Sequence, residues 1–253
     1  MEDYKIWNKS KQYGNLLYDR AIGKKEEMES SKSVCEVIKP IYKKGMKILD
    51  VGCGAGHYLR SLREHLDKNV NYTGIDATEY YIDKASKAFP GVRFFIDDIN
   101  DIDFKDNSFD IVICNNVLVH LPPSLDNPIN ELLRVSSKYV IIRTPIAKRN
   151  YIIKEVRDHK DKLNKEVIKK LTVLINKKGE PTMWNYLNLY TKEFLEDIVL
   201  KVNPDYVVNF IKDNGFKKLK DKAESETVTK IIEGKQVSGN IILDWYFVVV
   251  GVS

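Results

Sequence analysis

KILDVGCGAGHYLRSL, residues 47–62, is the stretch that decides the fold of this chain. A short apolar run comes first, and three glycines follow at alternate positions, Gly52, Gly54 and Gly56. Glycine adopts backbone conformations closed to other residues and lets the chain approach a ligand closely. The residues after the glycines repeat apolar side chains at helical spacing. The stretch therefore predicts a buried strand, a ligand-binding loop and a helix, in that order.

The segments that follow alternate between strand and helix patterns. We expect strands at 47–51, 71–76, 92–96, 108–115 and 138–144, and helices at 57–66, 79–89 and 128–135. Such alternation is typical of parallel strands joined by right-handed crossovers, with helices on both faces of one sheet. The sequence thus predicts a doubly wound α/β fold.

Outside this alternation the patterns are mixed. We expect one or two short helices in 1–34, lying as a cap over the sheet edge, and an amphipathic helix over most of 150–177. We expect a single domain that spans 1–253. By elimination, the segment 145–190 is expected to be an inserted substrate cover with helical and aromatic parts. Later in the chain we expect two helices, at 192–202 and 204–216, the first with Thr191 as its N-cap. We expect strands within 216–220, 226–240 and 241–251.

Composition limits the class of protein. The chain has 253 residues, a net charge of +5 and 43% hydrophobic residues, which is ordinary for a globular domain. No apolar run approaches the roughly 20 residues that span a bilayer, and the N-terminus lacks a signal-peptide pattern. We therefore expect a cytoplasmic protein with no membrane partner. The three cysteines lack metal-ligand spacing, so we expect reduced thiols and no metal site.

The glycine spacing separates two kinds of nucleotide ligand. A pyrophosphate-binding loop reads Gly-x-Gly-x-x-Gly, whereas Gly52, Gly54 and Gly56 are one residue tighter. Asp50 ends the preceding strand, where its carboxylate would repel a pyrophosphate and attract an ammonium group. The loop therefore fits a nucleoside with a positively charged tail.

The motifs in their order resemble those of class I S-adenosylmethionine-dependent methyltransferases, in particular the small-molecule, type 11-like group. The resemblance runs through ILDVGCGAGHYL, YTGIDAT, FFIDDINDIDFKDNSFDIVICNNVLVHLPP and ELLRV, over about residues 45–145. It implies a Rossmann-like sheet of seven strands, mostly parallel with an antiparallel last strand, and an enzyme of class EC 2.1.1 that uses S-adenosyl-L-methionine. One departure is RVSSKYVII, which lacks the usual glycine turn before the fifth strand.

The resemblance also implies roles for residues that hold the methionine end of the cofactor. These residues follow the first and fourth strands, and they are Asp50, Gly52, Cys53, Gly54, Gly56 and Asn115.

The nucleoside end is assigned in the same way. Asp76 would bind both ribose hydroxyls, and Ala77 would pack against the adenine. Asp98 and the backbone N–H of Ile99 would contact the edge of the adenine. Because Asp97 adjoins Asp98, either acid is able to occupy the adenine position.

The acceptor site is expected near the carboxyl ends of the fourth and fifth strands. His120 is the candidate catalytic base, because an imidazole titrates near neutrality; the alternative is packing before Pro122. Arg143 is a candidate clamp for a carboxylate or phosphate, against an ordinary strand residue that reaches solvent. The remaining histidines that we consider, His57, His65 and His159, are predicted to be helical, exposed and without a chemical role.

Three aromatic residues after position 183 are the other acceptor candidates. Trp184, Tyr186 and Tyr190 would line the acceptor chamber, or would serve only as a hydrophobic plug.

The leading hypothesis is a methyltransferase for a small-molecule acceptor, acidic or sugar-like, that acts as a monomer or homodimer. The alternatives are an RNA or protein methyltransferase, for which the lysine-rich stretch 148–178 is the only indication, and a non-catalytic regulatory module that binds the cofactor. The first alternative is disfavoured because moderate basic surplus is common on solvated helices. The second requires a filled acceptor chamber.

Overall fold

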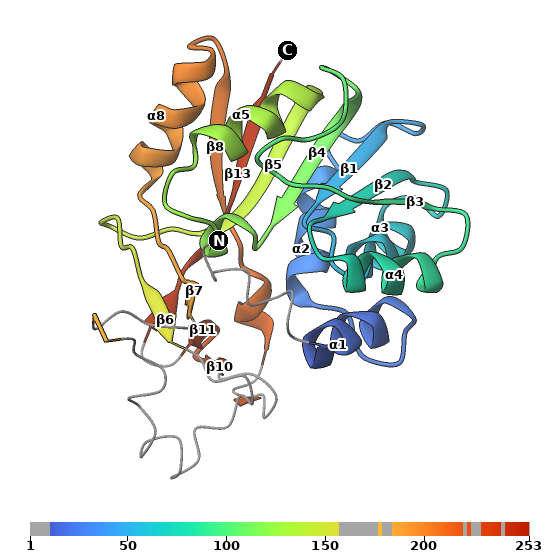
Figure 1. Cartoon of the computed structure of the whole chain (residues 1–253), viewed down its shortest axis with the longest axis horizontal. Coiled ribbons are helices and arrows are strands. Elements are labelled where there is room, and N and C mark those ends of the chain that lie inside the picture. Colours follow the sequence, from blue (N-terminus) through green and yellow to red (C-terminus); the bar gives the residue numbers. More distant parts are fainter. Residues whose placement is uncertain are drawn as a thin grey trace.

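The fold is built around a seven-stranded sheet with the strand order β3-β2-β1-β4-β5-β13-β8 (Figure 1). The computed structural model describes residues 11–156, 177–178, 184–219, 222–223, 229–238 and 241–252. The strands are β1 (Lys47–Val51), β2 (Asn71–Asp76), β3 (Arg93–Ile96), β4 (Phe109–Asn115), β5 (Ser136–Pro145), β8 (Val207–Lys212) and β13 (Trp245–Gly251). β1 to β5 pair in parallel, and β13 is antiparallel to both of its neighbours. The predicted sheet, including its antiparallel last strand, is confirmed.

Helices cover both faces of the sheet because the central strands are apolar on both faces. Ile48 and Ile111 belong to the core on one face, and Leu49 and Val112 belong to the core on the other. The first core includes α2 (Glu29–Ile38) and α3 (His57–His65), and the second includes α5 (Asp126–Val135) and α8 (Lys192–Val202). The side chain of Thr191 accepts a hydrogen bond from the N–H of Phe194 at 3.1 Å, which confirms the predicted N-cap of α8.

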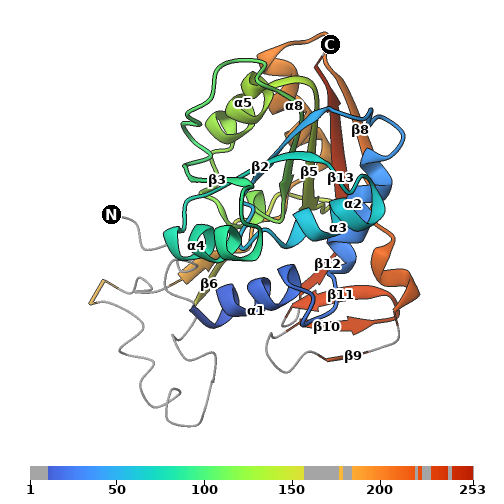
Figure 2. The same ribbon diagram turned by 90° about the vertical axis from the view of Figure 1, so that its right-hand side faces the viewer.

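The N-terminal region forms α1 (Lys11–Ala21) and then α2. α1 packs against α3 and α4 (Glu79–Ala88), and Figure 2 shows it beside these helices. Close approach to α4 requires glycine on α1, since a Cβ on Gly14 would lie 2.7 Å from the ring of Tyr81. α2 lies on the sheet face that α3 also covers. The N-terminal helices therefore reach both a face of the sheet and the helices around its carboxyl end.

Two small sheets gather below the main sheet in the view of Figure 1. β6 (Lys154–Val156) pairs with β7 (Trp184–Tyr186), and β9 (Lys222–Ala223), β10 (Thr229–Ile232), β11 (Lys235–Ser238) and β12 (Ile241–Leu243) form the other. A separate apolar cluster joins them to the loop after β4 and to β13; it contains Val119, Leu187, Leu189, Leu243 and Trp245. The 3₁₀ turn that follows β4, η2 (Leu118–His120), is thereby attached to segments far away in sequence.

Three sequence-based expectations need correction. The predicted helix 204–216 is the strand β8, because Val208 and Phe210 pack on the core while their neighbours face solvent, and β13 supplies the partner strand. The predicted strand 216–220 begins as a 3₁₀ turn, η3 (Gly215–Lys218). The predicted helix 150–177 lies mostly outside the described residues, and its described part contains the strand β6.

The strand and turn expected in 226–240 are present as the hairpin of β10 and β11, with Glu233 and Gly234 at positive φ. All three cysteines are unpaired and buried, as expected. Within the described ranges, no helix has the length and apolar character that crossing a bilayer requires.

Candidate active site

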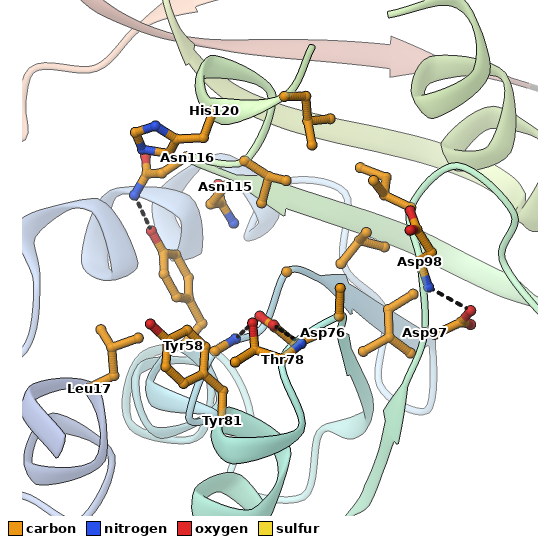
Figure 3. Close-up of a pocket in the computed structure, with 18 of the residues that line it drawn as sticks. Leu17, Tyr58, Asp76, Thr78, Tyr81, Asp97, Asp98, Asn115, Asn116 and His120 are labelled. Carbon is orange, nitrogen blue, oxygen red and sulfur yellow. Dashed lines mark hydrogen bonds between the residues drawn. The ribbon is translucent and has the colours of Figure 1, made fainter. Parts of the chain in front are cut away.

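A cavity of about 210 Å³ lies at the carboxyl ends of β1, β2, β3 and β4 (Figure 3). α1 contributes Tyr13 and Leu17 to its wall. The loops after four parallel strands converge there, as expected for ligand sites in open α/β sheets. Several residues that the sequence predicts for a ligand site line this cavity: Gly52, Gly54, Asp76, Ala77, Asp98, Ile99, Asn115 and His120.

The glycine loop forms one wall of the cavity. Gly52 has a φ of 76°, and a Cβ at this position would lie 2.3 Å from a methyl carbon of Val117. The N–H groups of Gly52 and Cys53 both donate to the carbonyl of Ile75, at 2.8 and 2.9 Å. The loop is therefore folded back onto β2, and its backbone faces the cavity where a side chain would not fit.

Asp76 joins this loop to the turn after β2. One carboxylate oxygen accepts from the N–H of Gly54 at 2.9 Å, and the other accepts from the N–H of Thr78 at 2.9 Å. Burial raises the pKa of Asp76, although both backbone donors oppose that shift. A carboxylate offers about four acceptor positions, so both oxygens keep capacity for a ligand. Asp76 thus shapes the cavity and remains able to bind hydroxyl groups.

The structure separates the roles of Asp97 and Asp98. Asp97 accepts from the backbone N–H groups of Asp98 and Asp103, at 2.8 and 3.1 Å, and so closes its own loop. Asp97 also lines the cavity, but Figure 3 shows its carboxylate bonded to the backbone of Asp98. Oδ1 of Asp98 accepts from the backbone N–H and the side-chain amide of Asn100, at 3.0 and 2.8 Å. Of the two acids, Asp98 is the better candidate to face a ligand.

Two asparagines follow β4 with contrasting environments. Asn115 is 7% exposed, and neither atom of its amide has a partner among the described residues. Asn116 has a φ of 62°, accepts from the guanidinium of Arg143 and donates to the hydroxyl of Tyr58 at 3.4 Å. A buried amide without partners costs free energy unless a ligand satisfies it. Asn115 is therefore the clearest sign that the cavity is a binding site.

His120 lies on η2 and lines the same cavity. Its Nδ1 is 2.8 Å from the backbone carbonyl oxygen of Tyr186. A carbonyl oxygen only accepts hydrogen bonds, so Nδ1 carries the proton and Nε2 is the basic nitrogen of the neutral ring. The imidazole is thus held in the tautomer that a general base facing away from Tyr186 requires.

Arg143 does not line the cavity, which corrects its prediction as an acceptor clamp. It is 1% exposed, and its Nε and a terminal nitrogen lie 2.7 and 2.6 Å from Oδ2 of Asp213. The guanidinium also lies 4.1 Å from the ring centroid of Trp245. Arg143 is therefore committed to a buried ion pair that joins β5 to the end of β8. Asp213 is 70 positions away in sequence, and no local pattern identifies it.

The predicted aromatic lining is also corrected. Trp184, Tyr186 and Tyr190 are all buried, and none lines the cavity. The rings of Trp184 and Tyr186 pack edge to face at 4.4 Å, and Tyr190 stacks on Phe194 at 5.2 Å. These rings therefore match the alternative prediction, in which they serve as a hydrophobic plug. The backbone carbonyl of Tyr186 contacts the site through Nδ1 of His120.

His57 belongs to the site although the sequence predicts it to be exposed. It is 8% exposed, lines the cavity, and has an Nδ1 without a partner among the described residues. Burial, together with the nearby positive charge of Arg20, lowers the pKa of His57 to about 3. Helical periodicity does not reveal this position, because the burial depends on tertiary packing around α3, against which α1 lies. His65 is exposed beside Glu27 as expected, and His159 lies outside the described residues.

Asp50, Cys53 and Gly56 support the glycine loop without lining the cavity. The Tyr72 hydroxyl donates to Asp50 at 2.6 Å, and Asp50 is 1% exposed. Burial raises the pKa of Asp50 to about 7, which the bond from Tyr72 opposes. The sequence predicts a direct attraction between Asp50 and a charged ligand. Instead, Asp50 is bound by the Tyr72 hydroxyl and does not line the cavity.

Comparison with known proteins places the chain among methyltransferases. The profile of the methyltransferase domain family matches residues 42–215. Sterol 24-C-methyltransferase erg-4 of Neurospora crassa is 36% identical over 37% of this chain and 25% of its own length. Phosphoethanolamine N-methyltransferase 3 of Arabidopsis thaliana is 25% identical over 75% of this chain and 45% of its own length. The chain thus spans from a quarter to less than half of these two relatives.

Solved structures share the fold. A complex of the Haloferax volcanii Trm112 methyltransferase activator with a putative methyltransferase aligns with a TM-score of 0.59 at 13% identity, over 94% of this chain and 95% of that chain. Magnesium protoporphyrin IX methyltransferase from Synechocystis PCC 6803, solved with S-adenosylmethionine, aligns with a TM-score of 0.57 at 13% identity, over 100% and 98% of the chains. At these identities the likeness shows the fold alone.

We predict that Asp213→Ala lowers the free energy of unfolding by about 3–5 kcal/mol, because it leaves the Arg143 charge buried without its partner. Asp244→Ala is the matched control: it breaks the exposed pair with Lys212 and should cost under about 1 kcal/mol. Urea unfolding of both variants measures the difference. Equal losses would show that the buried pair has no special structural role.

We predict that His57 makes the protein less stable as pH falls. Its pKa is 6.5 in the unfolded chain and about 3 in the folded protein, so between these values only the unfolded chain takes up the proton. The free energy of unfolding therefore decreases by up to about 1.4 kcal/mol per pH unit below 6.5. His57→Asn removes this titration, so its stability should decline less between about pH 7 and pH 4.5 in urea unfolding.

The raised pKa of Asp50 has the opposite effect, because it favours the folded state at low pH. This contribution is the same in the wild type and in His57→Asn, so it cancels when the two are compared. Parallel pH profiles for the wild type and His57→Asn would contradict the assignment.

Proposed function

The chain belongs to the class I S-adenosylmethionine-dependent methyltransferases, and we propose that it methylates a small molecule that enters the cavity beside His120. The observation that carries the proposal is the cavity itself. It joins the glycine loop, the carboxylate of Asp76 and the unsatisfied amide of Asn115 in one space. Each of these groups matches a part of a nucleoside that bears an amino-acid tail.

The residues present fit S-adenosylmethionine. Asp76 would accept from the ribose hydroxyls with the capacity that Gly54 and Thr78 leave on its oxygens. Asp98 and the backbone of Ile99 would meet the adenine, and Asn115 would satisfy its amide on the methionine side. When bound, the cofactor supplies a methyl group on a positively charged sulfur, which a nucleophile attacks in line.

The charged side chains of the described cavity wall favour an acceptor that is not acidic. The acidic residues that line it are Asp76, Asp97 and Asp98. The described wall contains neither lysine nor arginine. Arg143, the predicted anion clamp, is buried in its ion pair. An acidic acceptor would find neither a lysine nor an arginine among the described residues of this wall. We therefore favour a neutral acceptor, such as a hydroxyl compound of the sugar-like kind, or an amine.

His120 is the residue that we assign to the acceptor. Methylation of an O–H or N–H nucleophile releases one proton, and Nε2 of His120 is the basic nitrogen because Nδ1 donates to Tyr186. The chain's contribution is thus to hold the acceptor in line and to take its proton. No residue is needed to activate the methyl group.

Two alternative functions have weaker support. An RNA or protein acceptor calls for a contiguous basic surface, and the described cavity wall is acidic. A non-catalytic module would have a filled acceptor chamber, whereas the cavity beside Asn115 and His120 is open. The names of the two curated relatives, a sterol and a phosphoethanolamine methyltransferase, also favour a small molecule. We propose a monomer or a homodimer that acts in the cytoplasm without nucleic acid.

We predict that the wild type binds S-adenosylhomocysteine in calorimetry and does not bind NAD. Asp76→Ala should weaken binding by about 2–4 kcal/mol, because the ribose hydroxyls lose their charged partner. Asp83→Ala, which removes an exposed carboxylate on α4, is the control and should leave the affinity unchanged. Tight binding of NAD alone would refute the proposed cofactor.

We predict that turnover of S-adenosylmethionine with amines or hydroxyl compounds exceeds turnover with carboxylic acids, measured by release of S-adenosylhomocysteine. For an acceptor that reacts, His120→Asn should lower kcat/KM by roughly 10²- to 10⁴-fold. Its amide is still able to donate to the Tyr186 carbonyl but lacks a basic nitrogen. Unchanged kcat/KM in His120→Asn would remove His120 from the reaction, and turnover of carboxylic acids alone would contradict the acceptor class.

A further inference from the structure

His57 is a buried polar group that the chemistry above does not use. It begins α3, directly after Gly56, and more than nine-tenths of its surface is buried. It lines the cavity, and its Nδ1 has no partner within the described part of the chain. Burying such a nitrogen costs free energy that a ligand is able to recover. The position of this nitrogen shows which part of a ligand it would meet.

The edge of the imidazole that carries Nδ1 lies against the glycine loop. A Cβ built on Gly54 would be 3.6 Å from Cε1 and 3.8 Å from Nδ1 of His57. The Tyr58 ring packs edge to face at 4.8 Å and Leu17 of α1 also reaches Gly54, so the imidazole is enclosed on this side. Nδ1 therefore lies next to the loop backbone and away from bulk solvent.

The charges around the cavity differ between its two ends. Asp76 and Asp98 contribute carboxylates where β2 and β3 end. Near His57, the positive charge of Arg20 on α1 is close enough to act on the imidazole. The N-terminus of α3 adds a partial positive charge at the same place. The end of the cavity at His57 therefore favours a negatively charged group on the ligand.

We propose that His57 recognises the amino-acid end of S-adenosylmethionine, with Nδ1–H donating a hydrogen bond to its carboxylate. This inference rests on the proposed function. The carboxylate is preferred over the ammonium group because Arg20 and the helix terminus disfavour a second cation. His57 is thus a specificity-determining residue: it distinguishes nucleosides that carry the amino-acid tail from nucleosides that lack it.

The test compares two ligands that differ only at this end. S-adenosylhomocysteine carries the amino acid, and 5′-methylthioadenosine lacks it while keeping the adenine, ribose and thioether. In calorimetry, His57→Leu should weaken the binding of S-adenosylhomocysteine by about tenfold or more, the scale of one lost hydrogen bond. The affinity for 5′-methylthioadenosine should be unchanged. His57→Asn should retain both affinities, since an Asn amide places a polar atom near the position of Nδ1.

The outcomes separate this inference from the proposed function. Unchanged binding of S-adenosylhomocysteine by His57→Leu would overturn the role of His57, and an equal loss for both ligands would show that His57 only packs the loop. If His57→Leu does not fold, the same ligand pair is applied to His57→Gln, whose polar atoms lie near Nε2 instead. Selective loss in His57→Gln but not in His57→Asn supports the inference. Failure of the wild type to bind either ligand would instead refute the proposed function.

Discussion

The carboxylate of Asp76 holds together the two loops on which the site depends. It accepts from Gly54 in the loop after β1 and from Thr78 in the turn after β2. These loops follow adjacent parallel strands, so one side chain links two loops that line the cavity. The Ile75 carbonyl, which accepts from Gly52 and Cys53, fixes the same loop from the strand itself. Because both loops already hold Asp76 in place, a ligand that it binds would require little reorganisation of the site.

The acceptor side is organised by contacts between segments that are distant in sequence. His120 follows β4, and its tautomer is set by the carbonyl of Tyr186 in β7. Asn116, in the same loop, is held by Arg143, whose charge is balanced by Asp213 at the end of β8. The contact with Tyr186 therefore determines which nitrogen of His120 is basic, and the contacts of Arg143 with Asn116 and Asp213 help to position the loop after β4.

Local sequence was sufficient to locate the cavity-lining residues that follow β1, β2 and β3. The glycines, Asp76, Ala77, Asp98 and Ile99 follow strand ends that periodicity locates, and carboxyl ends of parallel strands meet at one edge. The interpretation of Asp97 and Asp98 stayed open in the sequence, because adjacent residues alternate in direction and only the hydrogen bonds of Asp97 show which acid closes the loop. The helix predicted at 204–216 is wrong because the pairing of β8 with β13, a long-range contact, outweighs local propensity.

The sequence by itself determined the order of strands and helices from β1 to β5, the glycine loop and the acids that follow the strands, since each depends on residues close together in the chain. The tertiary structure alone decided the environments of Arg143, His57 and Asp50. Arg143 forms a buried ion pair, His57 lines the cavity beside Gly54, and Asp50 accepts a hydrogen bond from Tyr72. Burial and partners set the charge and hydrogen bonding of a side chain, and both come from segments that local sequence patterns do not bring together.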